Sequence, residues 1–206
     1  MIESELERLY SYGRAMGTSG AAAIARFTKI LNDRTLPDNE RYSAAFEIAK
    51  ILHDGKIVPR SDTASIKYFA LSAKAGIVTA RVAYNTLAKI YFGDGFNPNI
   101  EMVLYWLKKA VEAGSNEATW TLAKIFRDGK FGVPKNGEKA LEILSVPASK
   151  DFDAINKTTA LRMIAEIHDK GLGVPVDKEK AAELYREAES ISAKWIYAIN
   201  RLQARA

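Results

Sequence analysis

The sequence predicts an all-α fold, a solenoid of stacked helix pairs, from three observations. A segment of the form Ala-Lys-Ile…Gly recurs at 49–55, 88–95 and 123–129, and a fourth copy at 165–171 has Glu in place of Lys. The leading alanines are 39, 35 and 42 residues apart. Each copy also carries a helical apolar stripe and is followed by a proline. A spacing of this kind is typical of a repeat array rather than of one globular core.

Each repeat opens with a predicted amphipathic helix. Its apolar residues fall at i, i+4, i+5 and i+8, which is one face of a helix with 3.6 residues per turn. Two alanines in each set let neighbouring helices approach closely, and the larger residues fill the space between repeats. The four sets are Ala44, Ile48, Ala49 and Leu52; Ala83, Leu87, Ala88 and Tyr91; Ala118, Leu122, Ala123 and Phe126; and Ala160, Ile164, Ala165 and His168.

A turn and a second helix complete each repeat. Glycine just past a helix end is the expected left-handed C-terminal cap, because it has no Cβ to clash. Proline then prevents the helix from continuing, and an Asp or Asn offers an oxygen to the first N–H groups of the next helix. The glycines are Gly55, Gly95, Gly129 and Gly171; the prolines are Pro59, Pro98, Pro134 and Pro175; and the predicted N-caps are Asp62, Asn99, Asn136 and Asp177.

The predicted organisation has four repeats between two capping segments. Residues 1–39 are expected to form a degenerate capping helix pair, with helices at 3–15 and 19–32, because they lack the Ala-Lys-Ile signature. The repeats are expected at about 40–78, 79–116, 117–156 and 157–190. Residues 191–206 are expected to form a C-terminal capping helix, with an apolar stripe that includes Ile191 and Trp195.

The fourth unit resembles a Sel1-like repeat, a relative of the tetratricopeptide repeat. The resemblance rests on Gly171-Leu172-Gly173-Val174 in the turn and on Lys180-Ala181 and Tyr185 in the second helix. The third unit keeps Gly132-Val133-Pro134 but has Pro147 where alanine is usual. The resemblance covers about residues 40–190. It implies a right-handed superhelix of antiparallel helix pairs. Members of this family mostly act as adaptors for other proteins and share no catalytic motif.

The composition excludes several classes of function. The 206 residues include no cysteine, which excludes disulfides, thiol nucleophiles and thiolate metal sites and fits a cytoplasmic protein. The N-terminus lacks the basic start and apolar run of a signal peptide, and no apolar stretch reaches the roughly 18–20 residues of a membrane span. The net charge of +5 and pI near 9.2 are typical of a solvated surface and leave acidic partners open.

No catalytic, cofactor or metal site is expected. The two histidines, His53 and His168, are far apart in the repeat array, and His168 is expected to pack in an apolar stripe. The Asp-Gly pairs at 54–55, 94–95 and 128–129 lack the alternating oxygen ligands of a calcium loop and are read as helix-end turns. We therefore expect that the protein is not an enzyme.

The candidate binding residues lie between the packing positions of the first helices. By the family resemblance these helices line a concave surface. Lys50, Lys89 and Lys124 recur at one repeat position, so they would form a basic row, and Glu166 reverses the sign in the fourth repeat. The sequence leaves open whether Trp120 is a buried filler or an exposed anchor, and whether the row is only a solvated face. The full set is Lys50, Arg81, Asn85, Lys89, Trp120, Lys124, Arg127, Arg162 and Glu166.

The leading hypothesis is a non-enzymatic adaptor or scaffold that binds a partner protein or peptide, including an acidic one, along a concave, mildly basic groove. One alternative is an RNA-binding helical repeat protein, which the uneven spacing and modest pI disfavour. Another is a regulatory subunit of a bacterial envelope-polysaccharide or secretion enzyme. The sequence does not predict the partner or the oligomeric state.

Overall fold

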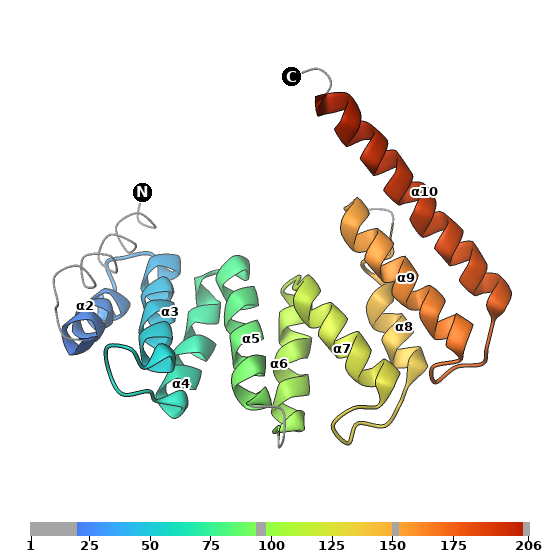
Figure 1. Ribbon diagram of the computed structural model, residues 1–206. Helices are drawn as coiled ribbons and strands as arrows, with labels where there is room; N and C mark the ends of the chain where they lie inside the picture. Colours follow the sequence, from blue (N-terminus) through green and yellow to red (C-terminus); the bar gives the residue numbers. More distant parts are fainter. Residues whose placement is uncertain (1–19, 94–97, 150–152, 204–206) are drawn as a thin grey trace. The chain divides into compact units, whose positions relative to one another are not determined.

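The protein is all-α in the part of the chain that the computed structural model describes, residues 20–93, 98–149 and 153–203 (Figure 1). These residues form α-helices and one short 3₁₀-helix and contain no β-strand. The predicted fold class is therefore confirmed. The chain divides into two compact units, residues 1–115 and 116–206, and each is described by itself.

In the first unit, each helix packs on the next one along the chain. α3 contacts α2 and α4, α5 contacts α4, and α6 contacts α5. The bounds are α2 Gly20–Asn32, α3 Asp38–Asp54, α4 Asp62–Ser72, the 3₁₀-helix η1 Ala73–Ala75, α5 Ile77–Phe92 and α6 Ile100–Glu112. The helix pairs α3–α4 and α5–α6 correspond to the first two predicted repeats. α2 corresponds to the second helix of the predicted leading pair, whose first helix lies outside the described residues.

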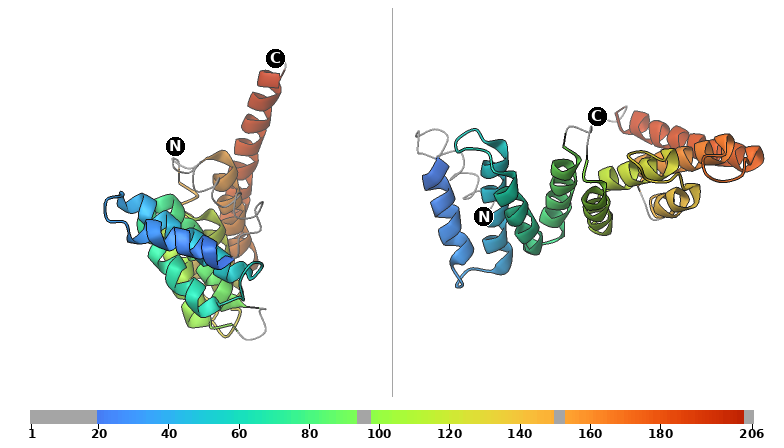
Figure 2. Two further views of the ribbon diagram at one scale, coloured as in Figure 1. Left: turned by 90° about the vertical axis from the view of Figure 1, so that its left-hand side faces the viewer. Right: turned by 90° about the horizontal axis from the view of Figure 1, so that it is seen from below.

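The second unit contains two further helix pairs. α7 packs on α8, α8 on α9, and α9 on α10. The bounds are α7 Asn116–Asp128, α8 Gly137–Ser145, α9 Ala154–Lys170 and α10 Lys178–Gln203. Figures 1 and 2 agree that α9 and α10 lie side by side.

The core follows the predicted apolar stripes, except that Leu52, Tyr91 and Ile164 are only partly buried. The two stripe alanines of every first helix are at most 3% exposed, which allows the close approach of helices that the sequence indicates. They are accompanied in the first unit by Ile48 and Leu87, both fully buried, and in the second by Leu122.

The glycine caps end the first helices as predicted in three repeats. Gly55, Gly129 and Gly171 have φ of +64°, +69° and +62°, a left-handed conformation that strains any residue with a Cβ. In the second repeat α5 ends at Phe92, and Gly93, also with positive φ, caps it. The predicted cap Gly95 lies outside the described residues.

Three of the four predicted N-caps are correct. Asn99, Asn136 and Asp177 accept hydrogen bonds from backbone N–H groups three residues later, at 3.2, 2.9 and 2.9 Å. The prediction of Asp62 is wrong by one residue. Ser61 caps α4, since its hydroxyl accepts from the N–H of Ala64 at 3.3 Å.

Asp62 is the first residue of α4 because its carboxylate is held elsewhere. Arg60 donates to both of its oxygens, at 2.9 and 3.1 Å, and His53 Nδ1 lies 3.3 Å from one of them. These contacts with Arg60, and secondarily with His53, lower the pKa of Asp62. The ionised side chain therefore joins the turn to the end of α3.

The C-terminal helix differs from the expected separate segment at 191–206. α10 runs without a break from Lys178 to Gln203. The ion pairs Lys178–Asp169 and Lys157–Glu187, at 2.8 and 3.1 Å, place the start of α9 beside residues near 190 of α10. The later part of α10 therefore extends past α9, as Figure 1 shows in red. Trp195, Ile196 and Tyr197 are exposed there, and a capping role for this segment stays a prediction.

Candidate functional site

The first helices of all four repeats carry a stripe of exposed and half-buried residues opposite their buried alanines. Its residues follow one another at i, i+4, i+7 and i+11, a spacing that keeps side chains on one face of a helix. We call it the outward stripe, and none of its residues is buried. It consists of Asn39, Ser43, Phe46 and Lys50 on α3; Val78, Val82, Asn85 and Lys89 on α5; Glu117, Trp120 and Lys124 on α7; and Ile155, Thr159, Arg162 and Glu166 on α9.

Seven of the nine residues predicted from sequence fall on the outward stripe. They are Lys50, Asn85, Lys89, Trp120, Lys124, Arg162 and Glu166. Arg81 and Arg127 lie beside it and are half-buried. The pattern that the sequence identified as polar positions between packing residues is thus one face of each helix.

Two lysines of the row belong to the first unit. The Lys50 ammonium lies 3.2 Å from Glu47 Oε2 and 5.8 Å from the centre of the Phe46 ring. Lys89, at the same position one repeat later, is exposed. The Glu47–Lys50 pair is half-buried, since the two side chains are 20% and 38% exposed.

Asn85 has an internal role. Its side-chain Nδ2 donates to the hydroxyl of Ser115 at 2.8 Å, and that hydroxyl lies 3.1 Å from Asn85 Oδ1, within donating distance. Ser115 is buried at the end of the segment that follows α6. The side chain of Asn85 therefore fastens α5 to that segment.

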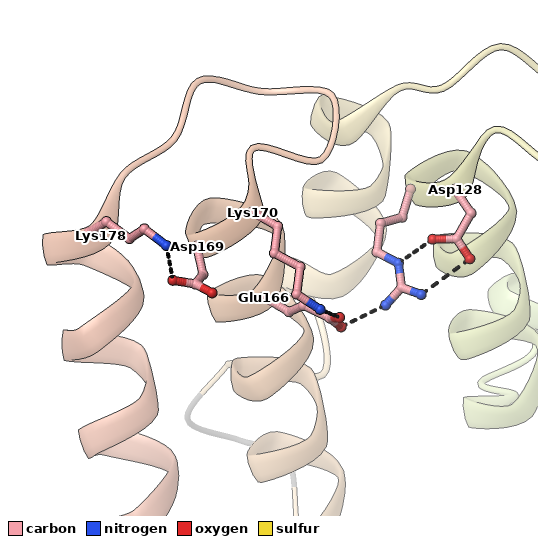
Figure 3. Close-up of polar contacts among 6 residues, drawn as sticks. Asp128, Glu166, Asp169, Lys170 and Lys178 are labelled. Atoms are coloured by element: carbon pink, nitrogen blue, oxygen red, sulfur yellow. Dashed lines mark hydrogen bonds and ion pairs between the residues drawn. The ribbon is translucent and has the colours of Figure 1, made fainter.

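Arg127 and Glu166 connect α7 to α9 in the second unit (Figure 3). The Arg127 guanidinium donates to both oxygens of Asp128, at 2.6 and 3.2 Å, and to Glu166 Oε2 at 2.9 Å. Glu166 also accepts from Lys170 at 2.6 Å. The hydrogen bonds from Arg127 hold the pKa of Asp128 below its usual value.

This network explains why the fourth repeat has Glu166 at the position where the other three repeats have a lysine. A lysine at position 166 would place a cation against Arg127, whose side chain is only 15% exposed. Glutamate instead forms the ion pair between neighbouring repeats. The remaining predicted residues of this unit are the exposed Lys124 and Arg162 and the half-buried Trp120, which is neither a core filler nor a fully exposed side chain.

Sequence reasoning missed the aliphatic members of the outward stripe. Val78, Val82 and Ile155 are 63%, 44% and 58% exposed. The signal was present in the i, i+4, i+7, i+11 spacing that leads back from Lys89 and Glu166. An aliphatic residue at such a position is usually read as a packing residue, whereas the predicted set consists of polar and charged residues and Trp120.

The Asp-Gly turns considered as calcium loops are helix ends where the structure describes them. The described residues contain no group of three or more His, Asp or Glu side chains arranged to hold a metal ion. Gly55 and Gly129, of the Asp-Gly pairs at 54–55 and 128–129, cap helix ends, and the pair at 94–95 lies outside the described residues. In the same part of the chain, no helix combines the length and the apolar character needed to cross a membrane.

The repeat geometry agrees with a family match. The Sel1 repeat model matches residues 43–77, 82–115, 117–145 and 158–190, together well over half of the chain. The chain belongs to the Sel1 repeat family. Proteins of this family generally mediate protein–protein interaction, and the Sel1 fold is typically a non-enzymatic scaffold.

Relatives of this Sel1 repeat chain are bacterial. The Sel1-repeat-containing protein YjcO of Escherichia coli K12 is 32% identical over 85 residues, which is 41% of this chain and 36% of that protein. An uncharacterised YjcO of Shigella flexneri matches equally. The match thus spans about a third of these relatives.

Two solved structures are similar in fold. A Sel1 repeat protein from Oxalobacter formigenes has a TM-score of 0.48 and 20% identity, over 72% of this chain and 56% of that one. The protective antigen c5321 of uropathogenic Escherichia coli has a TM-score of 0.47 and 21% identity, over 91% of this chain and 45% of that one.

Proposed function

We propose that this Sel1 repeat protein is a non-enzymatic adaptor that binds a partner protein or peptide along the outward stripe. In this proposal the outward stripe lines the concave, mildly basic groove that the family resemblance led us to expect. The observation that supports the proposal most is the recurrence of a cation on the stripe of every first helix: Lys50, Lys89, Lys124 and Arg162. Each of these side chains is exposed or half-exposed.

The proposal assigns different roles to the nine residues predicted from sequence. Asn85, Arg127 and Glu166 hold the fold through the contacts described above. The four cations of the stripe, with Arg81 and Trp120, are the proposed binding surface. Cations at regular intervals favour a partner with carboxylates, because complementary charge speeds association and selects the partner.

The proposal also covers the surroundings of the site. We keep the four-repeat organisation with a leading capping pair and a C-terminal capping segment as a proposal. A cytoplasmic location is likewise proposed, on the absence of cysteine from the sequence.

The test reverses charge on the outward stripe and, as a matched control, on the second helices. Lys89→Glu with Lys124→Glu changes the net charge as much as Lys67→Glu with Lys108→Glu, whose lysines are exposed on α4 and α6. A partner identified by affinity capture and mass spectrometry is then titrated calorimetrically. We expect the stripe variant to bind at least about tenfold more weakly, or about 1.4 kcal/mol, with unchanged helicity and a near-normal control.

Other outcomes decide against the proposal. Equal weakening by both variants would indicate a general charge effect, and no weakening would remove the stripe from the site. A salt-dependent mobility shift with single-stranded RNA, lost in the stripe variant, would favour the RNA-binding alternative. A captured partner that is an envelope-polysaccharide or secretion enzyme would identify the chain as its regulatory subunit.

A further inference from the structure

The first half of α5 exposes a cluster of large aliphatic side chains. Ile77, Val78 and Val82 are 68%, 63% and 44% exposed. The opposite face of the same helix is closed, since Ala80, Ala83 and Leu87 are buried there. The cluster is therefore a surface feature of a firmly packed helix and not an incompletely formed core.

The outward stripe of α5 is polarised along the helix axis. Val78 and Val82 occupy its N-terminal half and Lys89 its C-terminal end, about 16 Å from Val78 at 1.5 Å per residue. Between them, the amide of Asn85 bonds to Ser115, and the hydroxyl of Thr86 donates to the carbonyl of Val82 at 2.9 Å. The amide in the middle of the stripe is thus bonded within the protein, and the two ends of the stripe differ in chemistry.

Among the four first helices that the structure describes, only α5 has an outward stripe with an aliphatic end and a basic end. At the positions of Val78 and Val82, α3 has Asn39 and Ser43, and α7 has Glu117 at the second position. α9 has Ile155 at the position of Val78, but its stripe ends in Glu166, which pairs with Arg127. Lys50 on the neighbouring α3 matches Lys89, so the basic end of the first unit has two cations.

We propose that the stripe of α5 sets the specificity of this adaptor for a peptide segment that is aliphatic at one end and acidic at the other. An aliphatic side chain of the partner packs on Val78 and Val82, and a carboxylate meets Lys89. In an extended segment, about 16 Å corresponds to about five residues. This inference rests on the proposed function and adds the chemistry and spacing of the partner.

The alternative chemistries fit the stripe less well. A purely acidic segment leaves the exposed valines in water, and a purely apolar one supplies no carboxylate to the basic end of the stripe. A segment with both features removes the aliphatic surface from water and supplies a carboxylate at the basic end.

The test uses a displayed library of random peptides of about twelve residues, long enough to span the stripe when extended. Selection against the full chain is expected to enrich peptides with Asp or Glu about five residues from Leu, Ile or Val. A synthetic peptide with the enriched sequence is then titrated against four proteins: the wild type, Val78→Ser with Val82→Ser, Lys89→Glu, and the control Ile57→Ser. Ile57 is exposed in the first unit but lies off the outward stripe.

The expected result is at least about tenfold weaker binding by the valine variant and by Lys89→Glu, a loss of about 1.4 kcal/mol each, with no change in the control. Circular dichroism checks that the variants keep their helices. If acidic peptides are enriched and bind the valine variant as tightly as wild type, this inference is wrong, but the proposed function still holds. No enrichment, or binding that Lys89→Glu also leaves unchanged, contradicts both.

Discussion

His168 occupies the last stripe position of α9, where the other first helices carry Leu52, Tyr91 and Phe126. The ring is 8% exposed, and Nε2 makes no hydrogen bond with any described residue. Burial, and secondarily the charge of Lys180, lower the pKa of His168, while Asp177 opposes this shift. The sequence predicted its packing role correctly, but a polar atom in that position remains unsatisfied.

The buried ring makes the second unit sensitive to acid. Because the folded state favours the neutral ring, the unfolded state binds more protons once the pH falls below about 6.5, and stability decreases. We expect His168→Leu to lose less stability than wild type when the pH falls from about 7.5 to about 5.5. At pH 7.5 the variant should be at least as stable as wild type, because an unsatisfied buried polar atom costs about 1–3 kcal/mol. Urea unfolding at both pH values checks this. An identical pH dependence in the two proteins would contradict it.

The misplaced N-cap of α4 shows why single residues are harder to predict than the helices that contain them. Ser61 and Asp62 both suit an N-cap by residue type. Arg60 and His53 decide between them by engaging the carboxylate. The partners of an exposed side chain depend on the path of the turn, which local sequence does not determine.

At the scale of elements, the glycine-rich turn of one repeat docks against the start of the second helix of the repeat before it. A Cβ on Gly137, the first residue of α8, would overlap the carbonyl oxygen of Leu172 in the turn between α9 and α10. In the first unit Gly20 begins α2, and its Cβ would overlap the carbonyl oxygen of Ile57 in the turn after α3. The sequence identified the turns, but not this contact, which links residues far apart in the chain.

Gly137→Ala tests this contact, because the contact determines whether the substitution raises or lowers the free energy of unfolding. Within a helix, Ala is favoured over Gly by about 1 kcal/mol when space allows. Because Gly137 abuts backbone, we expect a net loss of about 1–3 kcal/mol, as overpacking usually causes. Glu142→Ala, on the exposed side of α8, should stay within about 0.5 kcal/mol of wild type. Denaturant unfolding measures both, and a stabilised Gly137→Ala protein would show that the turn does not press on α8.

The Arg127–Glu166 pair is the element-scale link between α7 and α9. A double-mutant cycle with Arg127→Met and Glu166→Gln should give a coupling energy of about 0.5–1 kcal/mol at low salt. The coupling should shrink when the ionic strength is raised, because the two charges are still partly exposed to the salt solution, at 15% and 31%. Thermal unfolding at two salt concentrations provides the measurement. A coupling near zero would return both residues to the proposed binding surface.

The C-terminal helix could have been predicted as one element. No glycine or proline interrupts residues 178–203, and the stripe of Ala181, Leu184 and Ala188 continues into Ile191. Tertiary packing does not end this helix near residue 191. Only a glycine or proline in the sequence could have ended it there.

At the scale of the whole molecule, the repeat period predicted the fold because each unit packs mainly on its neighbours. Alanines and large apolar residues at fixed positions therefore specify the helix pairs and the core. The binding surface is less predictable, since the helical stripe pattern does not show which residues of the outward stripe also make contacts within the protein. Residue type alone located the cations, whereas the internal contacts of Asn85, Arg127 and Glu166 required the coordinates.

The central claim is that partners contact the first helices through the outward stripe. A photo-reactive benzophenone residue is placed singly at Lys89, Lys124 and Arg162, and as controls at Lys67, Lys108 and Glu142, which are exposed on second helices. The captured partner is added and irradiated, and cross-linked product is quantified. We predict cross-links from the three stripe positions and little from the controls. Cross-links from the second helices, with none from the stripe, would contradict the account.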